Sequence, residues 1–289
     1  MGRAHRAAVL GHPVAHSLSP VLHRAAYAAL GLNGWEYGQR DVDADELAGV
    51  LGELDESWAG LSLTMPLKQV ALTLVDQVEP LAQVVGAVNT ILVQPGKLLV
   101  GANTDVSGLV EALREATPNP PSPAARRGVI VGGGATACSA LAALGELGMP
   151  RPVVIVRSLG RSGAVLRAAA RMGVEPEYVG WGTDRASAAL RSGDVVISTV
   201  PTGAADSLVH ALAGSTIRPD QVLLDVVYDG WPTAFASAWR DAGGSISPGY
   251  LMLLHQACEQ VRLMTGQEAP TEAMRVVLLA ALDERAEEH

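Results

Sequence analysis

Short runs of apolar residues alternate with longer helix-like segments, most regularly in the second half of the chain. Near-continuous Val, Ile and Leu is typical of strands that are buried on both faces of a parallel sheet. Because helical segments separate these runs, the pattern predicts a doubly wound α/β domain. We expect its strands at 128–131, 153–156, 177–179, 194–199 and 222–227. One helix is expected at 136–147, and a second, rich in Ala and Arg, ends at Gly173.

The first third of the chain also alternates strands and helices. Ser19 as N-cap, followed by Pro20, predicts the start of a helix that ends at Gly31. Further elements are expected as strands at 7–10, 35–39 and 61–63, a helix spaced by Leu47, Val50, Leu51 and Leu54, a hairpin of 88–93 with 97–100, and a helix over 106–116. The Pro-rich loop 117–123 marks a domain junction, and two apolar helices, 250–265 and 270–285, close the chain.

Composition narrows the class of protein. A chain of 289 residues is long enough for two domains, and its net charge of −9 argues against nucleic acid as the main partner. The sequence has no uninterrupted apolar stretch of about 18 residues, so we expect no membrane span. Cys138 and Cys258 lie in Ala/Leu-rich helical contexts, which is typical of buried thiols in a reducing compartment. We therefore expect a cytoplasmic protein.

A glycine-rich turn follows the strand at 128–131. Gly132, Gly133 and Gly134 stand between that strand and the next helix, where a backbone without Cβ atoms can approach a pyrophosphate. Ala135 and Thr136 begin the helix, whose N-terminal amides attract anions. The turn predicts a dinucleotide site, although a tight βα turn in any doubly wound fold is the alternative reading.

The end of the next strand indicates which dinucleotide binds. An NAD site would carry Asp or Glu there for the ribose 2′-hydroxyl. The sequence instead reads Val156-Arg157-Ser158, with Arg161 close behind. Cations and a hydroxyl suit a 2′-phosphate, which favours NADP. The alternative is that these arginines only solvate a helix start.

Lys68 stands out against the composition. Of the 21 lysine and arginine residues, only Lys68 and Lys97 are lysines. Arginine stays protonated in proteins, whereas lysine can release and regain a proton. Lys68 ends the segment that begins at Gly60, and Asp105 ends the segment Gly-Ala-Asn-Thr-Asp that begins at Gly101. The two residues form a candidate pair for proton handling, with chance placement at a helix start as the alternative for Lys68.

Seven motifs then occur in order along nearly the whole chain. They are Gly11-x-Pro13-x-x-His16-Ser17-x-Ser19-Pro20 with His23; Thr64-x-Pro66-x-Lys68; Gly86-Ala87-Val88-Asn89-Thr90; Asn103-Thr104-Asp105-x-x-Gly108; the glycine turn; Asp225-x-Val227-Tyr228; and Gly249-x-x-Met252-Leu253-x-x-Gln256-Ala257. In these motifs the chain resembles the shikimate dehydrogenase family. The resemblance implies NADPH-dependent reduction of 3-dehydroshikimate to shikimate, in aromatic amino-acid biosynthesis.

The resemblance also implies roles for individual residues. Lys68 and Asp105 would be catalytic. Substrate contacts are expected from Ser17, Ser19, Thr64, Asn89, Tyr228 and Gln256. Cofactor contacts are expected from Gly132, Gly133, Gly134, Ala135, Thr136, Arg157, Ser158, Arg161, Thr199 and Gly249.

Because Gln256 returns from the C-terminal region, the resemblance implies a discontinuous substrate domain. We expect this domain at 1–107 and 247–289 and the NADP-binding domain at 108–246. Family members can be monomers or dimers, so both states remain open.

Some residues have other readings. Ser19, Thr64, Asn103 and Asp105 could act as helix caps. His12 and His16 have the spacing of a metal pair, but the turn at Pro13 and the lack of a third ligand argue against a metal.

Three positions depart from the usual family pattern: Ser62 and Val156 stand where asparagine is common, and Gly230 where proline is common. The closest alternative function is a quinate/shikimate or aminoshikimate-type dehydrogenase with broader substrate or NAD use. An alternative of another class is a non-catalytic regulatory paralogue that binds NADP.

Overall fold

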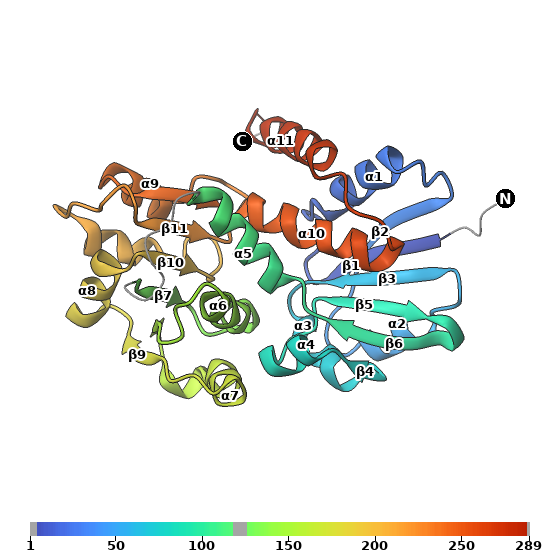
Figure 1. Ribbon diagram of the computed structural model, residues 1–289, viewed down its shortest axis with the longest axis horizontal. Coiled ribbons are helices and arrows are strands. Elements are labelled where there is room, and N and C mark those ends of the chain that lie inside the picture. Colours follow the sequence, from blue (N-terminus) through green and yellow to red (C-terminus); the bar gives the residue numbers. More distant parts are fainter. Residues whose placement is uncertain (1–4, 118–125, 288–289) are drawn as a thin grey trace. The chain divides into compact units, whose positions relative to one another are not determined.

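The computed structural model describes residues 5–117 and 126–287, and the chain divides into two compact units (Figure 1). The first unit comprises Met1–Asp105 and Leu253–His289, and the second comprises Val106–Met252. These borders differ by a few residues from those expected from the sequence. The expected loop at 117–123 lies, from residue 118 onward, outside the described residues.

The first unit is built on one mixed sheet. Its strands are β1 (His5–Gly11), β2 (Trp35–Asp41), β3 (Trp58–Leu63), β4 (Gln77–Val78), β5 (Thr90–Gln94) and β6 (Leu98–Ala102). They form six strands in the order β2-β1-β3-β5-β6-β4. β1 pairs in parallel with β2 and β3, whereas β5 is antiparallel to β3 and β6. The expected hairpin is therefore confirmed as β5 and β6.

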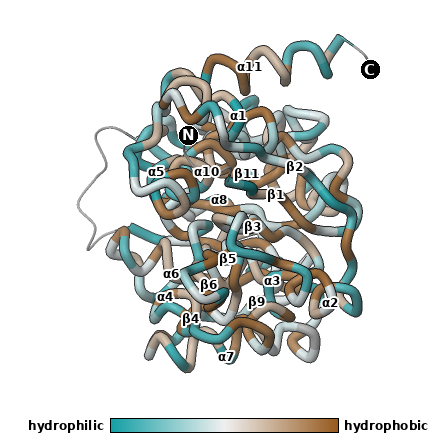
Figure 2. Tube along the Cα trace, turned by 90° about the vertical axis from the view of Figure 1, so that its right-hand side faces the viewer, coloured by the Kyte–Doolittle hydropathy of each residue, from teal (hydrophilic) through white to brown (hydrophobic). Residues whose placement is uncertain are grey.

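Helices of the first unit follow the strands. They are α1 (Ser19–Ala29), α2 (Leu47–Gly52), α3 (Leu67–Val70), α4 (Pro80–Val85), most of α10 (Gly249–Thr265), and α11 (Thr271–Glu287). Leu47, Leu61 and Ile91 are fully buried and belong to one hydrophobic cluster of this unit. β2 lies at the edge of the sheet and is largely hydrophilic (Figure 2).

The expected N-cap of α1 is wrong. Leu18 occupies the N-cap position, and Ser19 is the first residue of the helix. The backbone N–H of Ser19 donates instead to Oγ of Ser17 at 3.3 Å. The first amides of a helix have no partner within it, so proline is accepted at more than one early position. A Ser-Pro pair therefore leaves the helix start uncertain by one residue.

The second unit is a doubly wound parallel sheet. Its strands are β7 (Gly128–Val131), β8 (Val153–Val156), β9 (Glu177–Gly180), β10 (Val195–Ser198), β11 (Val222–Asp225) and β12 (Ser245–Pro248). They are parallel throughout, in the order β12-β11-β10-β7-β8-β9. α5 (Asp105–Ala116) precedes β7. Between the strands run α6 (Ala135–Glu146), α7 (Gly163–Met172), α8 (Asp184–Ser192) and α9 (Ala234–Asp241).

This strand order has one functional consequence. The order reverses between β7 and β10, and in open α/β sheets ligands bind beyond the carboxyl ends of the strands at such a switch point. The glycine turn follows β7 directly. The α/β fold class expected from the sequence is confirmed.

Among the helices of the described ranges, none combines the length and apolar character needed to cross a membrane.

Candidate active site

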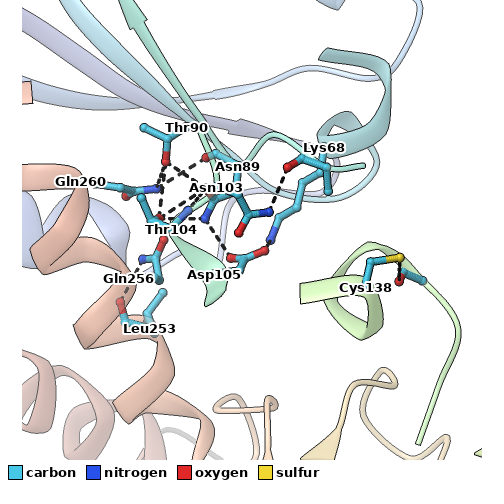
Figure 3. Close-up of polar contacts among 12 residues, drawn as sticks. Lys68, Asn89, Thr90, Asn103, Thr104, Asp105, Cys138, Leu253, Gln256 and Gln260 are labelled. Carbon is cyan, nitrogen blue, oxygen red and sulfur yellow. Dashed lines mark hydrogen bonds and ion pairs between the residues drawn. The ribbon is translucent and has the colours of Figure 1, made fainter. Parts of the chain in front are cut away.

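Lys68 and Asp105 form a shielded ion pair in the first unit (Figure 3). Lys68 lies on α3, shortly after β3 ends, and Asp105 is the first residue of α5, shortly after β6 ends. Nζ of Lys68 lies 2.6 Å from Oδ2 of Asp105, with 15% of the lysine side chain and 3% of the aspartate side chain exposed. The structure thus brings together the two residues that the sequence singled out for proton handling.

The second carboxylate oxygen of Asp105 is also hydrogen-bonded. The side-chain amide of Asn89 donates to Oδ1 of Asp105 at 2.8 Å and to Oγ1 of Thr104 at 2.9 Å. The backbone N–H of Thr104 in turn donates to Oδ1 of Asn89 at 2.8 Å. A buried carboxylate needs such partners, because burial removes the water that would otherwise solvate its charge. Asp105 therefore has a donor on each oxygen.

Local backbone contacts hold the two segments of the pair in place. The backbone N–H of Asn89 donates to the carbonyl of Ala102, next to the end of the β5–β6 ladder. The backbone N–H of Val88 donates to the carbonyl of Lys68 at 2.7 Å. Asn103 donates from its side chain to the carbonyl of Ala87 at 2.9 Å. The Gly86–Thr90 motif is therefore bonded on one side to the lysine and on the other to the segment that carries Asp105.

The close approach of Thr64 explains Gly11 in the first motif. The backbone N–H of Thr64 donates to the carbonyl of Leu10, which places Thr64 against the end of β1. A Cβ atom on Gly11 would lie only 2.2 Å from Cγ2 of Thr64. Glycine is therefore required for the packing of the Thr64 segment on β1. The N-cap position of α3 belongs to Pro66 and not to Thr64.

The remaining expected substrate residues lie on α1, on α10 and after β11. Ser19 is buried and Ser17 half-buried at the start of α1. Gln256 is buried on α10 and donates to the carbonyl of Leu253 at 2.9 Å, which leaves its side-chain oxygen to be used elsewhere. Tyr228 follows β11 in the second unit and is half-buried.

His12, which with His16 has the spacing of a metal pair, is hydrogen-bonded to an acid. Nδ1 of His12 lies 2.6 Å from Oδ1 of Asp41, and this hydrogen bond raises the pKa of His12 while lowering that of Asp41. The side chains of His12 and Asp41 are both more than half exposed. Over residues 5–117 and 126–287, no group of three or more His, Cys, Asp or Glu side chains is placed to hold a metal ion.

The glycine turn of the second unit leaves no room for side chains at its first position. Gly132 has a φ of +123°, and a Cβ atom there would lie 2.3 Å from Oγ1 of Thr199. Thr199 is held by two hydrogen bonds to the carbonyl of Val131, both 2.9 Å long. The chain then enters α6 at Ala135, with Gly134 as N-cap. Thr199, which directly follows β10, therefore packs against the glycine turn that follows β7.

Arg157 stands at the position that distinguishes NAD from NADP. It follows β8, is exposed, and places its guanidinium 5.1 Å from the ring centroid of Trp181. Nη2 of Arg157 donates to the carbonyl of Ala204 at 3.0 Å. Ser158, also exposed, precedes the short 3₁₀ helix Leu159–Arg161. A cation is thus oriented where an NAD site would present an acid.

Gly249 has a structural role that the sequence did not indicate. A Cβ atom at this residue would lie 2.5 Å from the backbone C and O atoms of Val226 and 2.6 Å from the carbonyl oxygen of Asp225. The first turn of α10 therefore packs directly on the backbone that leaves β11. This packing accounts for the glycine whether or not it also lies against a cofactor.

Several polar residues around Asp105 had no role that could be expected from the sequence. Thr90, Thr104 and Gln260 are all buried and hydrogen-bonded to one another or to Asn89 (Figure 3). Gln260 follows Gln256 by four residues, which places both on one face of a helix. That spacing was the available signal.

Comparison with known proteins identifies the family. The model of the shikimate dehydrogenase substrate binding domain matches residues 9–91, and that of the shikimate 5′-dehydrogenase C-terminal domain matches residues 249–279. A shikimate dehydrogenase (NADP(+)) from Rubrobacter xylanophilus is 35% identical over 272 residues, which cover 93% of this chain and 94% of the relative. The chain belongs to the shikimate dehydrogenase family.

Solved structures of this family share the fold over nearly the whole chain. Shikimate dehydrogenase from Mycobacterium tuberculosis is 38% identical, with a TM-score of 0.84 over 96% of this chain and 99% of that one. Shikimate 5-dehydrogenase from Thermus thermophilus, in complex with NADP(H) and shikimate, is 31% identical, with a TM-score of 0.78 over 96% and 99% of the two chains. The family resemblance that the seven motifs indicated is therefore confirmed.

Proposed function

We propose that this protein catalyses the reversible, NADPH-dependent reduction of 3-dehydroshikimate to shikimate in aromatic amino-acid biosynthesis. Membership of the shikimate dehydrogenase family supports the reaction. The observation that carries the proposal is the shielded pair of Lys68 and Asp105, 2.6 Å apart. A regulatory protein that only bound NADP would not need a lysine held in this way beside a buried carboxylate.

Proton transfer is assigned to Lys68. Bound NADPH supplies the hydride that reaches the ketone carbon of the substrate. As negative charge develops on the ketone oxygen, an ammonium can stabilise it and then donate the proton. Oδ2 of Asp105 accepts a hydrogen bond from the ammonium of Lys68, which holds the lysine in place for this role.

Asp105 is assigned two roles. It orients the ammonium of Lys68 through Oδ2, and it binds a hydroxyl of the substrate. Asn89 holds the other oxygen of Asp105, so the carboxylate cannot rotate freely.

Substrate recognition is assigned to short polar side chains. A cyclic polyol acid needs several hydroxyl and amide groups converging on it. We assign the carboxylate to Ser17 and Ser19, with Tyr228 nearby. The hydroxyls and the carbonyl are assigned to Thr64, Asn89 and Gln256 together with the catalytic pair.

The residues present fit NADP. The turn at Gly132, Gly133 and Gly134 carries no Cβ atoms, as a backbone that approaches a pyrophosphate requires. Ala135 and Thr136 add the N-terminal amides of α6. For the 2′-phosphate we assign Arg157, Ser158 and Arg161, and for the nicotinamide side Thr199 and Gly249.

We further propose a cytoplasmic monomer or homodimer that acts on this small molecule and not on nucleic acid. The net charge of −9 supports the last point, because nucleic-acid binding needs a basic surface.

Initial rates of nicotinamide reduction test the proposal. Shikimate and quinate are each paired with NADP and with NAD. We expect turnover with shikimate and NADP far above the other three combinations. Comparable rates with quinate or NAD would instead place the protein among the dehydrogenases of broader specificity. Binding of NADP without any turnover would indicate the regulatory alternative.

A further inference from the structure

A chain of hydrogen bonds runs through the first unit toward Asp105. The hydroxyl of Tyr37 donates to Ser62 Oγ at 2.6 Å, and Ser62 donates to Oε1 of Gln260 at 2.8 Å. Nε2 of Gln260 donates to Oγ1 of Thr90 at 3.0 Å. The chain then continues from Thr90 to Oδ1 of Asn89 at 3.0 Å, and from Nδ2 of Asn89 to Oδ1 of Asp105 at 2.8 Å (Figure 3).

The direction of this chain is fixed at its Asp105 end. An ionised carboxylate only accepts hydrogen bonds, so Asn89 must turn its NH₂ group toward Asp105. The backbone N–H of Thr104 only donates, so it requires the oxygen of Asn89 on the other side. Two partners with fixed roles therefore determine the orientation of the Asn89 amide.

The same logic then sets every earlier link. Since Thr90 donates its only hydroxyl proton to Asn89, it must accept from Gln260, and only the NH₂ group of Gln260 can donate. The oxygen of Gln260 is then left to accept from Ser62, which in turn accepts from Tyr37. Each link donates toward Asp105, and aligned hydrogen bonds of this kind polarise and strengthen one another.

All members of the chain are shielded from water. Tyr37, Thr90 and Gln260 are each at most 2% exposed. Gln260 comes from α10, whereas Ser62 belongs to β3 and Thr90 to β5. One glutamine thus connects α10 to two strands that are far away in sequence. In a dry environment a broken link cannot be replaced by a water molecule without cost.

We infer that Gln260 is a positioning residue for catalysis: acting through Thr90 and Asn89, it fixes the carboxylate of Asp105 and with it the ammonium of Lys68. This inference rests on the proposed function. It goes beyond it by giving α10 a role in the geometry of the Lys68–Asp105 pair. Gln260 itself touches neither Lys68 nor Asp105 through any contact that the structure records among its described residues.

A purely structural role for Gln260 would be to fasten α10 to the sheet. That role would change thermal stability but not the ratio of kcat to the KM for NADP. A positioning role instead changes kcat, leaves the KM for NADP unchanged, and is restored by any side chain that restores the link to Asn89. The two roles are therefore separable by kinetics.

Thr90 provides the matched set of variants. Thr90→Val keeps the shape of the side chain and removes the hydroxyl, whereas Thr90→Ser keeps the hydroxyl. Because small misplacements of catalytic groups are costly, we expect Thr90→Val and Gln260→Met to lower kcat by about tenfold or more. Thr90→Ser should stay near the wild-type value. Folding is checked by circular dichroism and by NADP affinity.

A control variant on α10 distinguishes the loss of any hydrogen bond from the loss of a link in this chain of hydrogen bonds. The hydroxyl of Thr265 donates to the carbonyl of Val261 at 2.7 Å and belongs to no link described above. Thr265→Val should lower the melting temperature and leave kcat unchanged. If folded Thr90→Val and Gln260→Met turn over within twofold of wild type, the inference is overturned. A drop in kcat that Thr90→Ser shares equally would overturn it as well.

A second measurement does not depend on activity. The side-chain amide signals of Asn89 can be followed by ¹⁵N NMR in the wild type and in Tyr37→Phe, which removes only the first donor of the chain. We expect the Asn89 amide signals to shift and to exchange faster with solvent. Unchanged signals would sink the inference. Absence of wild-type turnover, with the NMR result as expected, would instead refute the proposed function and leave the hydrogen-bond chain in place.

Discussion

Lys68 and Asp105 come from segments separated by 37 residues, yet their charged groups lie 2.6 Å apart and largely out of solvent. The lysine stands in a chain that uses arginine for 19 of its 21 basic residues, since only Lys68 and Lys97 are lysines. A guanidinium could form the same ion pair, but it could not release a proton. We therefore expect the lysine of this pair to serve in proton transfer and not only in charge balance.

Replacing Lys68 should abolish most of the turnover. Lys68→Met removes the proton donor, and general acid catalysis contributes about 10²- to 10⁴-fold in rate. We expect kcat to fall within that range while NADP binding, measured by fluorescence titration, stays near wild type. Lys68→Arg is the matched control: it keeps the positive charge beside Asp105, so it should fold well but remain nearly inactive. Turnover close to wild type in either variant would remove Lys68 from the mechanism.

The sequence could predict those elements whose apolar pattern is continuous. β7 and β8 were expected with the bounds that the structure gives them, because their four residues are all buried in a parallel sheet. β4 and α4 were not expected. In the case of β4, a strand of two residues, Gln77–Val78, is too short to show any periodicity. The Ser19 cap failed because proline is accepted at more than one early helix position.

The candidate site, too, could be predicted only in part from the sequence. Lys68 and Asp105 could be predicted because each ends a motif of adjacent residues. The partner of Thr90 could not, because Gln260 lies 170 residues further along the chain and the contact depends on how α10 packs. A buried glutamine carries no local pattern beyond its spacing of four residues from Gln256. Tertiary contacts of this kind are visible only in the folded chain.

Arg157 should control the preference between cofactors. Its exposed guanidinium lies over Trp181 and donates to the carbonyl of Ala204, so it is held in place at the end of β8. A hydrogen bond to a charged group contributes about 1.5–3 kcal/mol, which corresponds to roughly 10- to 150-fold in affinity. Arg157→Asp should therefore raise the KM for NADP by at least about tenfold, with a smaller change for NAD.

The control for this prediction is Arg151→Asp, which makes the same charge change at an exposed residue before β8. It should leave the ratio of the two KM values unchanged, as measured by initial rates at fixed shikimate. An unaltered NADP-to-NAD ratio in Arg157→Asp would refute the assignment of this arginine to the 2′-phosphate.

His23 should make the protein less stable in mild acid. Its side chain is fully buried, stacks on Tyr37 with ring centroids 3.9 Å apart, and bonds to the carbonyl of Ser19. Burial lowers the pKa of His23 from 6.5 to about 4. The unfolded chain therefore binds this proton between pH 6.5 and 4 while the folded chain does not, so stability falls as the pH drops through this window.

The size of that loss can be measured. From pH 6.5 to 5 it amounts to about 2 kcal/mol, at about 1.4 kcal/mol per pH unit. Urea unfolding at pH 7 and pH 5 should show the wild type losing about that much more than His23→Phe, which keeps the ring stacked on Tyr37 but cannot be protonated. Equal losses in the two proteins would show that His23 is protonated in the folded state.

Gly249 should tolerate no side chain, for reasons of packing alone. An alanine Cβ would lie 2.5 Å from the backbone of Val226, and backbone atoms cannot move aside as the end of a flexible side chain can. We expect Gly249→Ala to destabilise the protein by about 3 kcal/mol, at the upper end for overpacking, as measured by thermal unfolding. Gly145, on α6, has open space within 4 Å of the place that a Cβ would occupy, so Gly145→Ala should instead stabilise by up to about 1 kcal/mol. A melting temperature for Gly249→Ala at or above that of wild type would mean that the first turn of α10 can move away from β11, and that the glycine is kept for its approach to a ligand.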